Sequence, residues 1–263
     1  GTGTITISDK IGTATSGTLT ALTINAGNGE TSAGSIILSG DIGSTSQVGV
    51  SGVTKIGNTS TAEITFGGDL YRTTGSATYA ASGTAPSNQT GSFDMNSGGT
   101  AIKFQSTDNA ITFSTGTIDL AEGVDLTVDT DAAGGAITIG SIRGTIASSN
   151  DTAETVTLDA GTGTTAVGAI GATTEIGSVT IGSAQDGDIT LNGAIVANGA
   201  VSLDGDVTLG ADISITTSDD AISFNHTIDG GQALVLSSGT GTITISDKIG
   251  TATSGTLTAL TIN

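Results

Sequence analysis

Three-residue units of an apolar, a small polar and an apolar residue recur along the whole chain, and they constrain the fold more than any other feature. They include Ile5-Thr6-Ile7, Val156-Thr157-Leu158 and Ile222-Ser223-Phe224, and Gly, Asp, Asn or Ser flanks most of them. Alternation with a period of two is the signature of strands with one buried face. No window has the apolar spacing of an amphipathic helix, and each interior glycine would destabilise a helix by about 1 kcal/mol. The sequence therefore predicts an all-β fold.

The strand units follow one another too closely for a β-sandwich. Between positions 201 and 215 a new unit starts every six residues, at Val201, Val207 and Ile213. Six residues hold a three-residue strand and a tight corner, whereas most strands have about five or six residues. A parallel β-helix accommodates such short strands, because each coil stacks on the one before it. The spacing of the units predicts a β-solenoid with about nine irregular coils per 238 residues.

The first 25 residues, GTGTITISDKIGTATSGTLTALTIN, recur letter for letter at positions 239–263. Terminal caps of solenoid proteins differ from interior repeats, because they must shield the core. Identical ends that carry ordinary strand units therefore predict that 1–263 is one continuous β-solenoid segment of a tandem array with a 238-residue period. We expect the two copies to occupy equivalent positions on a common axis, and adjacent copies of the repeat to be each other's partners.

The stretch 71–99 has a weak strand signal, and we expect it to be a loop-rich excursion from the regular coil. It contains both tyrosines, the only proline and the only methionine of the chain. Two interpretations stay open: a long corner without a binding role, and a contact loop whose exposed aromatic residues bind a partner. The contact loop would use Tyr71, Tyr79, Pro86 and Phe93.

The charge of the chain excludes two classes of partner. The net charge is −19, from 25 acidic and 6 basic residues. Nucleic-acid binding requires clustered Lys and Arg, which the sequence lacks, so we expect no nucleic-acid partner. No apolar run approaches the roughly 18 residues of a membrane-spanning helix, so we expect no membrane insertion.

Residues 199–250, GAVSLDGDVTLGADISITTSDDAISFNHTIDGGQALVLSSGTGTITISDKIG, resemble the repeats of the filamentous-haemagglutinin-like, β-strand-repeat family of giant bacterial surface adhesins. The resemblance covers about 164–263 and 1–25, and it is poor over 71–99. It implies a right-handed parallel β-helix, an extracellular or cell-surface location, and a structural role in a long fibre or adhesin. Other fibres and cell-surface glycans are the further partners that it implies.

Residues suited to catalysis are sparse, and we expect the chain not to be an enzyme. It has no cysteine, and no nucleophile-elbow signature accompanies His226, its only histidine. The alternative is a carbohydrate-active β-helix that binds or cleaves polysaccharides with paired carboxylates. Candidate carboxylates stand near predicted corners, where aspartate is also common for structural reasons: Asp204, Asp206, Asp212, Asp219, Asp220 and Asp229.

Asp125, Asp129 and Asp131, in GVDLTVDTDAAGG, are candidates for metal ligands. Their carboxylates would suit Ca²⁺, which prefers oxygen ligands. The spacing satisfies neither the EF-hand pattern nor the nonapeptide calcium repeat. Apart from this candidate calcium ion, the sequence predicts no cofactor.

Overall fold

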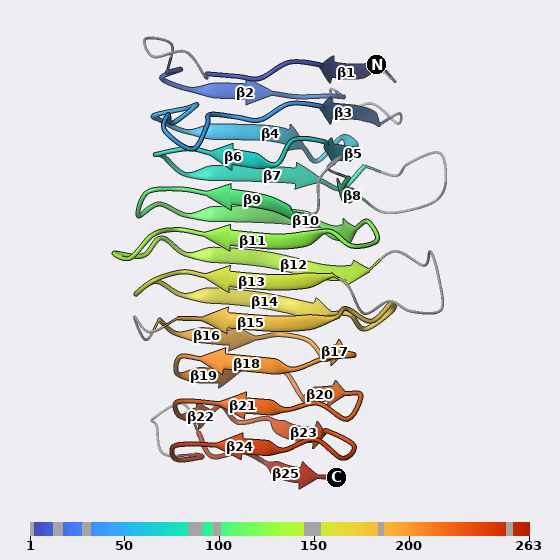
Figure 1. The fold of residues 1–263 in the computed structure, drawn as a ribbon, viewed down its shortest axis with the longest axis vertical. Helices are drawn as coiled ribbons and strands as arrows, with labels where there is room; N and C mark the ends of the chain where they lie inside the picture. The colour runs from blue at the N-terminus through green and yellow to red at the C-terminus, as the bar shows by residue number, and fades with distance from the viewer. Residues whose placement is uncertain are drawn as a thin grey trace.

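The computed structural model describes residues 3–12, 18–27, 33–83, 91–96, 101–144, 154–183, 187–250 and 255–263. All regular elements in these ranges are strands, and the strands pair in parallel. Successive turns of the chain stack in one column from the N-terminus to the C-terminus (Figure 1). The predicted all-β fold, a parallel β-helix, is confirmed.

Each turn of the column has three sides, here called faces 1, 2 and 3, and the chain visits them in the order 3, 2, 1. Face 1 is a ladder of β1 (Thr4–Ile7), β3 (Gly34–Leu38), β5 (Thr61–Phe66), β8 (Ser92–Met95), the second halves of β10 (Ile111–Leu120), β12 (Ile137–Gly144) and β14 (Thr165–Ile170), and then β17 (Ile195–Ala197), β20 (Ile213–Thr217), β23 (Ala233–Ser237) and β25 (Ala259–Ile262).

The other two faces are built in the same way. Face 2 contains β2 (Leu22–Ile24), β4 (Thr54–Asn58), β7 (Ala77–Ala81), the first halves of β10, β12 and β14, and then β16 (Ile189–Leu191), β19 (Val207–Leu209) and β22 (Ile228–Asp229). Face 3 contains β6 (Leu70–Arg72), β9 (Ala101–Gln105), β11 (Asp125–Asp129), β13 (Thr155–Asp159), β15 (Ser178–Gly182), β18 (Val201–Asp204), β21 (Ile222–Phe224) and β24 (Ile243–Ile245).

The ladders give the number of turns. Among the described residues, eight turns have a strand on face 3, and bridges at Ile11 and Ile42 continue that face toward the N-terminus. On face 1, nine steps of one turn lead from β1 to β23, and the next strand, β24, lies on face 3. The 238 residues between the two copies of the repeated segment therefore hold about nine and one-third turns, in agreement with the predicted nine.

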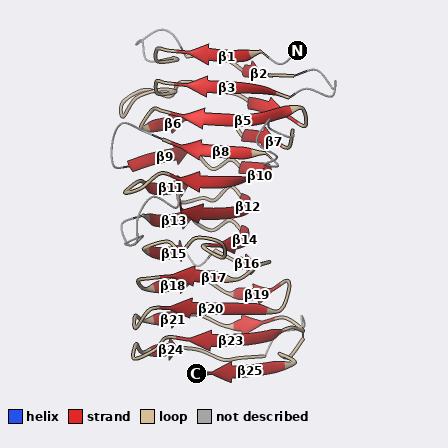
Figure 2. Ribbon diagram, turned by 90° about the vertical axis from the view of Figure 1, so that its right-hand side faces the viewer, coloured by secondary structure: helices blue, strands red, loops and turns tan. Residues whose placement is uncertain are grey.

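This fractional number corrects one expectation. The two copies do not occupy equivalent positions, because β1 of the first copy is on face 1 and β24 of the second is on face 3. The two ends of the column are formed by strands of these copies, with β1 at one end and β25 at the other (Figure 2).

The interior consists of stacked columns of side chains. Alternate residues of each strand point inward: in β13, Val156 and Leu158 are buried while Thr157 is partly exposed. The register stacks inward residues of successive turns on each other, as in one column of face 3: Phe104, Val128, Leu158, Ile181, Leu203 and Phe224. Burial of each such side chain contributes about 1.5–3 kcal/mol to the free energy of unfolding. Because successive turns each add side chains to these columns, the core extends along the axis.

Glycine is needed where turns approach each other at the ends of strands. Gly182, at the end of β15, has φ of 87°, a conformation that other residues rarely adopt. A Cβ atom there would lie 2.1 Å from the carbonyl oxygen of Asp204 in the next turn. The close contact between turns therefore excludes a side chain at this position.

The described parts of the segment 71–99, residues 71–83 and 91–96, belong to the regular coil, contrary to the sequence prediction. They contain most of β6 and all of β7 and β8, and Tyr71 and Tyr79 are each only 1% exposed. Phe93 is also buried. A contact loop of Tyr71, Tyr79 and Phe93 is therefore wrong, and Pro86 lies outside the described residues.

The strand pattern is weak here because alanine replaces the usual Ile or Val. Ala77 and Ala81 flank Tyr79 at the inward positions of β7, and the large ring fills space that the small residues leave. The ring of Tyr79 stacks on Phe113, with centroids 4.8 Å apart, and contacts Phe66 edge-on at 5.3 Å. The aromatic residues of this stretch therefore bulk out the core, and they are not available to a partner.

Candidate functional site

The three aspartates that were candidate calcium ligands serve the coil itself. Asp125 Oδ1 accepts hydrogen bonds from the backbone N–H and the hydroxyl of Thr155 in the next turn, at 3.0 and 2.7 Å. Asp129 Oδ2 lies 2.8 Å from Nζ of Lys103, and its Oδ1 accepts from the N–H of Asp131. No group of three or more His, Cys, Asp or Glu side chains suited to a metal ion occurs within the described ranges. The structure does not bring these aspartates together as a metal site.

Several aspartates of the carbohydrate-active alternative are likewise engaged at corners. Asp206 Oδ1 accepts from the N–H of Thr227, Asp212 Oδ1 from that of Ala233, and Asp219 Oδ1 from that of Thr240. Each bond joins one turn to the next over 21 residues. The aspartates therefore hold neighbouring corners together.

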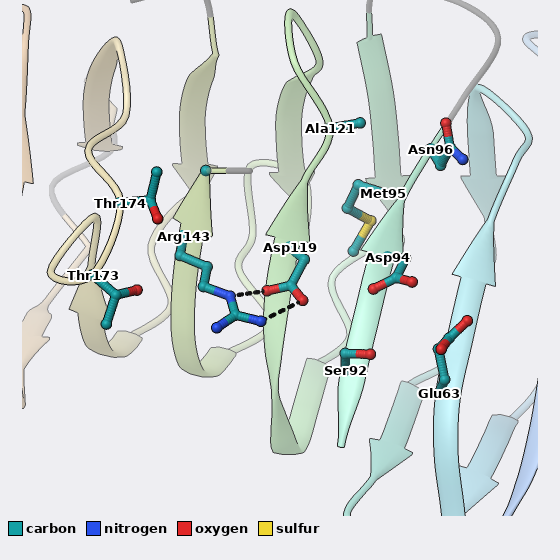
Figure 3. A pocket seen from close by; sticks show the side chains of 11 residues that line it. Glu63, Ser92, Asp94, Met95, Asn96, Asp119, Ala121, Arg143, Thr173 and Thr174 are labelled. Carbon is teal, nitrogen blue, oxygen red and sulfur yellow. Dashed lines mark hydrogen bonds and ion pairs between the residues drawn. The ribbon is translucent and has the colours of Figure 1, made fainter. Parts of the chain in front are cut away.

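A cavity that the sequence did not predict opens on face 1. It has a volume of about 510 Å³, and its charged lining residues are Glu63, Asp94, Asp119 and Arg143. They come from β5, β8, β10 and β12, four successive turns of the ladder (Figure 3). Their side chains stand on the outer side of the face, between inward-pointing neighbours such as Phe93 and Met95.

The register brings three of these charges into one row. Asp94 is directly opposite Asp119, and Asp119 is directly opposite Arg143 on the other side. Arg143 Nε donates to Asp119 Oδ1 at 2.5 Å, and Nη2 donates to Oδ2 at 2.9 Å (Figure 3). This two-pronged pair fixes the Asp119 carboxylate and neutralises it.

Asp94 is in a different electrostatic position from Asp119. Burial, together with the nearby carboxylates of Glu63 and Asp119, raises the pKa of Asp94 to about 6. A carboxyl with this pKa is partly protonated near neutral pH, so it can donate as well as accept a hydrogen bond. The cavity thus combines a fixed carboxylate, a guanidinium and a carboxyl that exchanges its proton.

These residues were missed because the sequence does not reveal how the strands of successive turns align with one another. A signal exists in the units Phe93-Asp94-Met95, Ile118-Asp119-Leu120 and Ile142-Arg143-Gly144, where a charge replaces the usual Ser or Thr at the outer position. Only the register shows that the three outer positions form one row.

Comparisons with family models, curated proteins and solved structures give no match to this chain. The likeness to adhesin repeats therefore stays a prediction from the sequence. Within the described residues, no helix is long and apolar enough to cross a membrane.

Proposed function

We propose that this chain is a structural repeat module of a long extracellular fibre or giant surface adhesin, with no catalytic activity. The observation that carries the proposal is the combination of a continuous parallel column with the same 25-residue segment at both of its ends. A solenoid of this kind lengthens by adding turns, and each turn contacts only its neighbours. Repeats joined in series would then form a stiff rod whose length increases with their number.

Two features support a mechanical role. The core is distributed along the whole axis, so no single region must stay intact for the rest to fold. The abundant acidic side chains include several that bond one turn to the next at corners, through Asp125, Asp206, Asp212 and Asp219. In an extracellular fibre, the negative surface would also keep the rods soluble.

The test is to express chains of one, two and three repeats and to measure particle length by negative-stain electron microscopy. Nine and one-third turns at the strand spacing of about 4.8 Å predict an increment of roughly 45 Å per repeat. Compact particles joined by flexible linkers, or a length that does not increase with repeat number, would contradict the proposal.

The cavity on face 1 favours a second candidate, a module that binds or cleaves polysaccharides. Carboxylates and guanidinium groups arranged across several turns suit the closely spaced hydroxyl groups of a glycan chain, and Asp94 can exchange a proton. Calorimetric titration with a panel of polysaccharides, comparing the parent chain with Asp94→Asn, tests binding, and release of reducing ends tests cleavage. Asp206→Asn, which changes a corner carboxylate outside the residues that line the cavity, is the matched control.

A further inference from the structure

The described parts of the two copies of the 25-residue segment share two strands, a bridge and a turn. Both contain a strand, a turn, a bridge and a second strand at the same places: β1, Ile11 and β2 in the first copy, and β24, Ile249 and β25 in the second. The turn is the same in both, since Lys10 N donates to Asp9 Oδ1 at 2.7 Å and Lys248 N donates to Asp247 Oδ1 at 2.8 Å. The local sequence therefore determines where the segment forms strands and where it turns.

The copies differ in the faces on which these strands lie. The first copy places β1 on face 1, Ile11 on face 3 and β2 on face 2. The second copy places β24 on face 3, Ile249 on face 2 and β25 on face 1. Every part of the second copy is one face further along the path of the chain, which corresponds to one third of a turn about the axis.

Each copy also shows one side of the same junction. The first copy shows the turn that covers the segment on its C-terminal side: β3 pairs with β1, Ile42 with Ile11, and β4 with β2. The second copy shows the turn on its N-terminal side: β21 pairs with β24, Ile228 with Ile249, and β23 with β25. Combining the two sets gives a continuous junction in which one segment is covered on both sides.

We propose that the C-terminal end of this repeat binds a second copy of the same sequence in this register, and that successive repeats are rotated by one third of a turn about the rod axis. In the junction, β24 pairs with β3 of the second repeat, and β25 pairs with its β4. This inference rests on the proposed rod function and specifies how its units are joined.

The inward side chains match across the junction. Ile243, which stacks on Ile222, is the same residue of the repeat as Ile5, which stacks on Ile36. Three further columns join in the same way. Ile245 stacks on Phe224, and its copy Ile7 stacks on Leu38; Ile249 and Ile11 join Ile228 to Ile42; Ile262 and Ile24 join Leu236 to Ile56. Apolar residues thus meet apolar residues in these four columns, whereas Leu260, the copy of Leu22, meets Thr54 in its column.

Burial of these residues indicates what the exposed end lacks. Ile24, which the next turn covers, is 8% exposed, whereas Ile262, the same residue of the repeat at the open end, is 54% exposed. Leu260 is likewise 41% exposed. A second repeat in the proposed register covers both side chains, as β4 covers β2. It also brings its Asp41 to Lys248, as Asp41 lies 2.6 Å from Lys10 within the repeat.

The experiment uses a two-repeat chain, residues 1–263 followed by 26–263, and cysteine pairs at outward positions. The natural sequence has no cysteine, so each introduced pair is unique. Thr6 is directly opposite Ile37, so the proposal places Thr244 of the first repeat opposite Ile37 of the second. Neighbouring parallel strands lie about 4.8 Å apart, a separation that a disulfide can bridge.

The decisive comparison is between two variants that share one of their cysteines. Both carry Ile37→Cys in the second repeat, with either Thr244→Cys or Thr261→Cys in the first. The rotated junction predicts that most of the Thr244→Cys chains form the disulfide and that the Thr261→Cys chains stay at background. If the second repeat continued without rotation, its β3 would follow β25 on face 1, and the result would be reversed.

The outcomes separate this inference from the rod function. A reversed result, with particles that still lengthen by one repeat, overturns the rotation and leaves the rod. No disulfide in either variant overturns the paired junction itself. Circular dichroism of both variants under reducing conditions must match that of the parent two-repeat chain, which controls for misfolding caused by the substitutions.

Discussion

At the scale of single residues, aspartate acts mainly as a link between turns. Asp206 is representative: its Oδ1 accepts from the N–H of Thr227 at 3.1 Å and from the hydroxyl of the same residue at 2.6 Å. These hydrogen bonds, chiefly the one from the Thr227 hydroxyl, hold the pKa of Asp206 below its ordinary value. Such links explain why an acidic chain can place many of its carboxylates at corners without a binding site.

Asp206→Ala should lower the free energy of unfolding by about 0.5–1.5 kcal/mol, because the Thr227 donors lose their acceptor. Since the pKa is lower in the folded state, the contribution of Asp206 is present above the unfolded-state pKa of about 3.9 and is lost as the pH falls below it. Urea unfolding at pH 7 and at pH 3 measures both effects. Asp206→Asn keeps an acceptor oxygen, so a loss as large as that of the alanine variant would contradict this role.

Asp94 should have the opposite pH dependence. Its pKa is raised by burial to about 6, so the folded state binds the proton more tightly than the unfolded state does. Its contribution to stability is therefore greatest below pH 4 and decreases as the pH rises through 6. Asp94→Asn removes this loss. After allowance for solvent screening, the free energy of unfolding of the variant relative to the parent should increase by about 1 kcal/mol between pH 4 and pH 8.

Thermal unfolding of both proteins at several pH values measures this difference. A difference in stability between Asp94→Asn and the parent that is the same at pH 4 and pH 8 would show that Asp94 is not the group that titrates.

At the scale of elements, equivalent strands on one face pack against different neighbours in the core. Phe104 of β9 and Phe224 of β21 occupy the same inward column of face 3. Phe104 lies among aromatic rings, with the centroid of Phe66 at 5.0 Å and that of Tyr71 at 4.9 Å. Phe224 is stacked between Leu203 and Ile245.

Phe104→Leu should therefore be more destabilising than Phe224→Leu. Both changes remove one ring, but only the first also removes edge and stacking contacts, which contribute roughly 0.5–1.5 kcal/mol per aromatic pair. Guanidinium unfolding of the two variants measures the difference, which should exceed about 1 kcal/mol. Equal losses would indicate that the rings act only through the volume that they fill.

Much of the fold could be predicted from the sequence, because strands in a solenoid need only local alternation and a corner. The units around Val201, Val207 and Ile213 are strands, as expected. The prediction is wrong for the described residues around Tyr79, because β7 has alanine at inward and outward positions alike and therefore carries little hydrophobic alternation. The cavity around Asp94 and Arg143 could not be predicted, because adjacent turns are separated by unequal numbers of residues and the register is set by packing.

At the scale of the whole molecule, the column has open ends. Strands at an open end present backbone groups that can pair with another chain, so the isolated segment is expected to associate end to end. Leu260 and Ile262 mark the C-terminal end, where their exposed fractions are 41% and 54%.

The double variant Leu260→Lys, Ile262→Lys should shift the isolated chain toward the monomer in sedimentation velocity at concentrations where the parent associates. Two lysines at the end of the core oppose burial by a second copy, because unpaired buried charges are costly. Val53→Lys changes a residue that is 49% exposed but lies outside the last strands, and it is the control. Equal dissociation by both variants would point to association through the sides.

The fraction of a turn left over in each repeat has a consequence for diffraction. In an array joined as proposed, three repeats bring the chain back to the same orientation, so the true axial period is three times roughly 45 Å, or about 135 Å. Such a rod has a threefold screw axis, and oriented fibres of it would give meridional reflections only on every third layer line. A rod of unrotated repeats would have a period three times shorter and reflections on all of its layer lines.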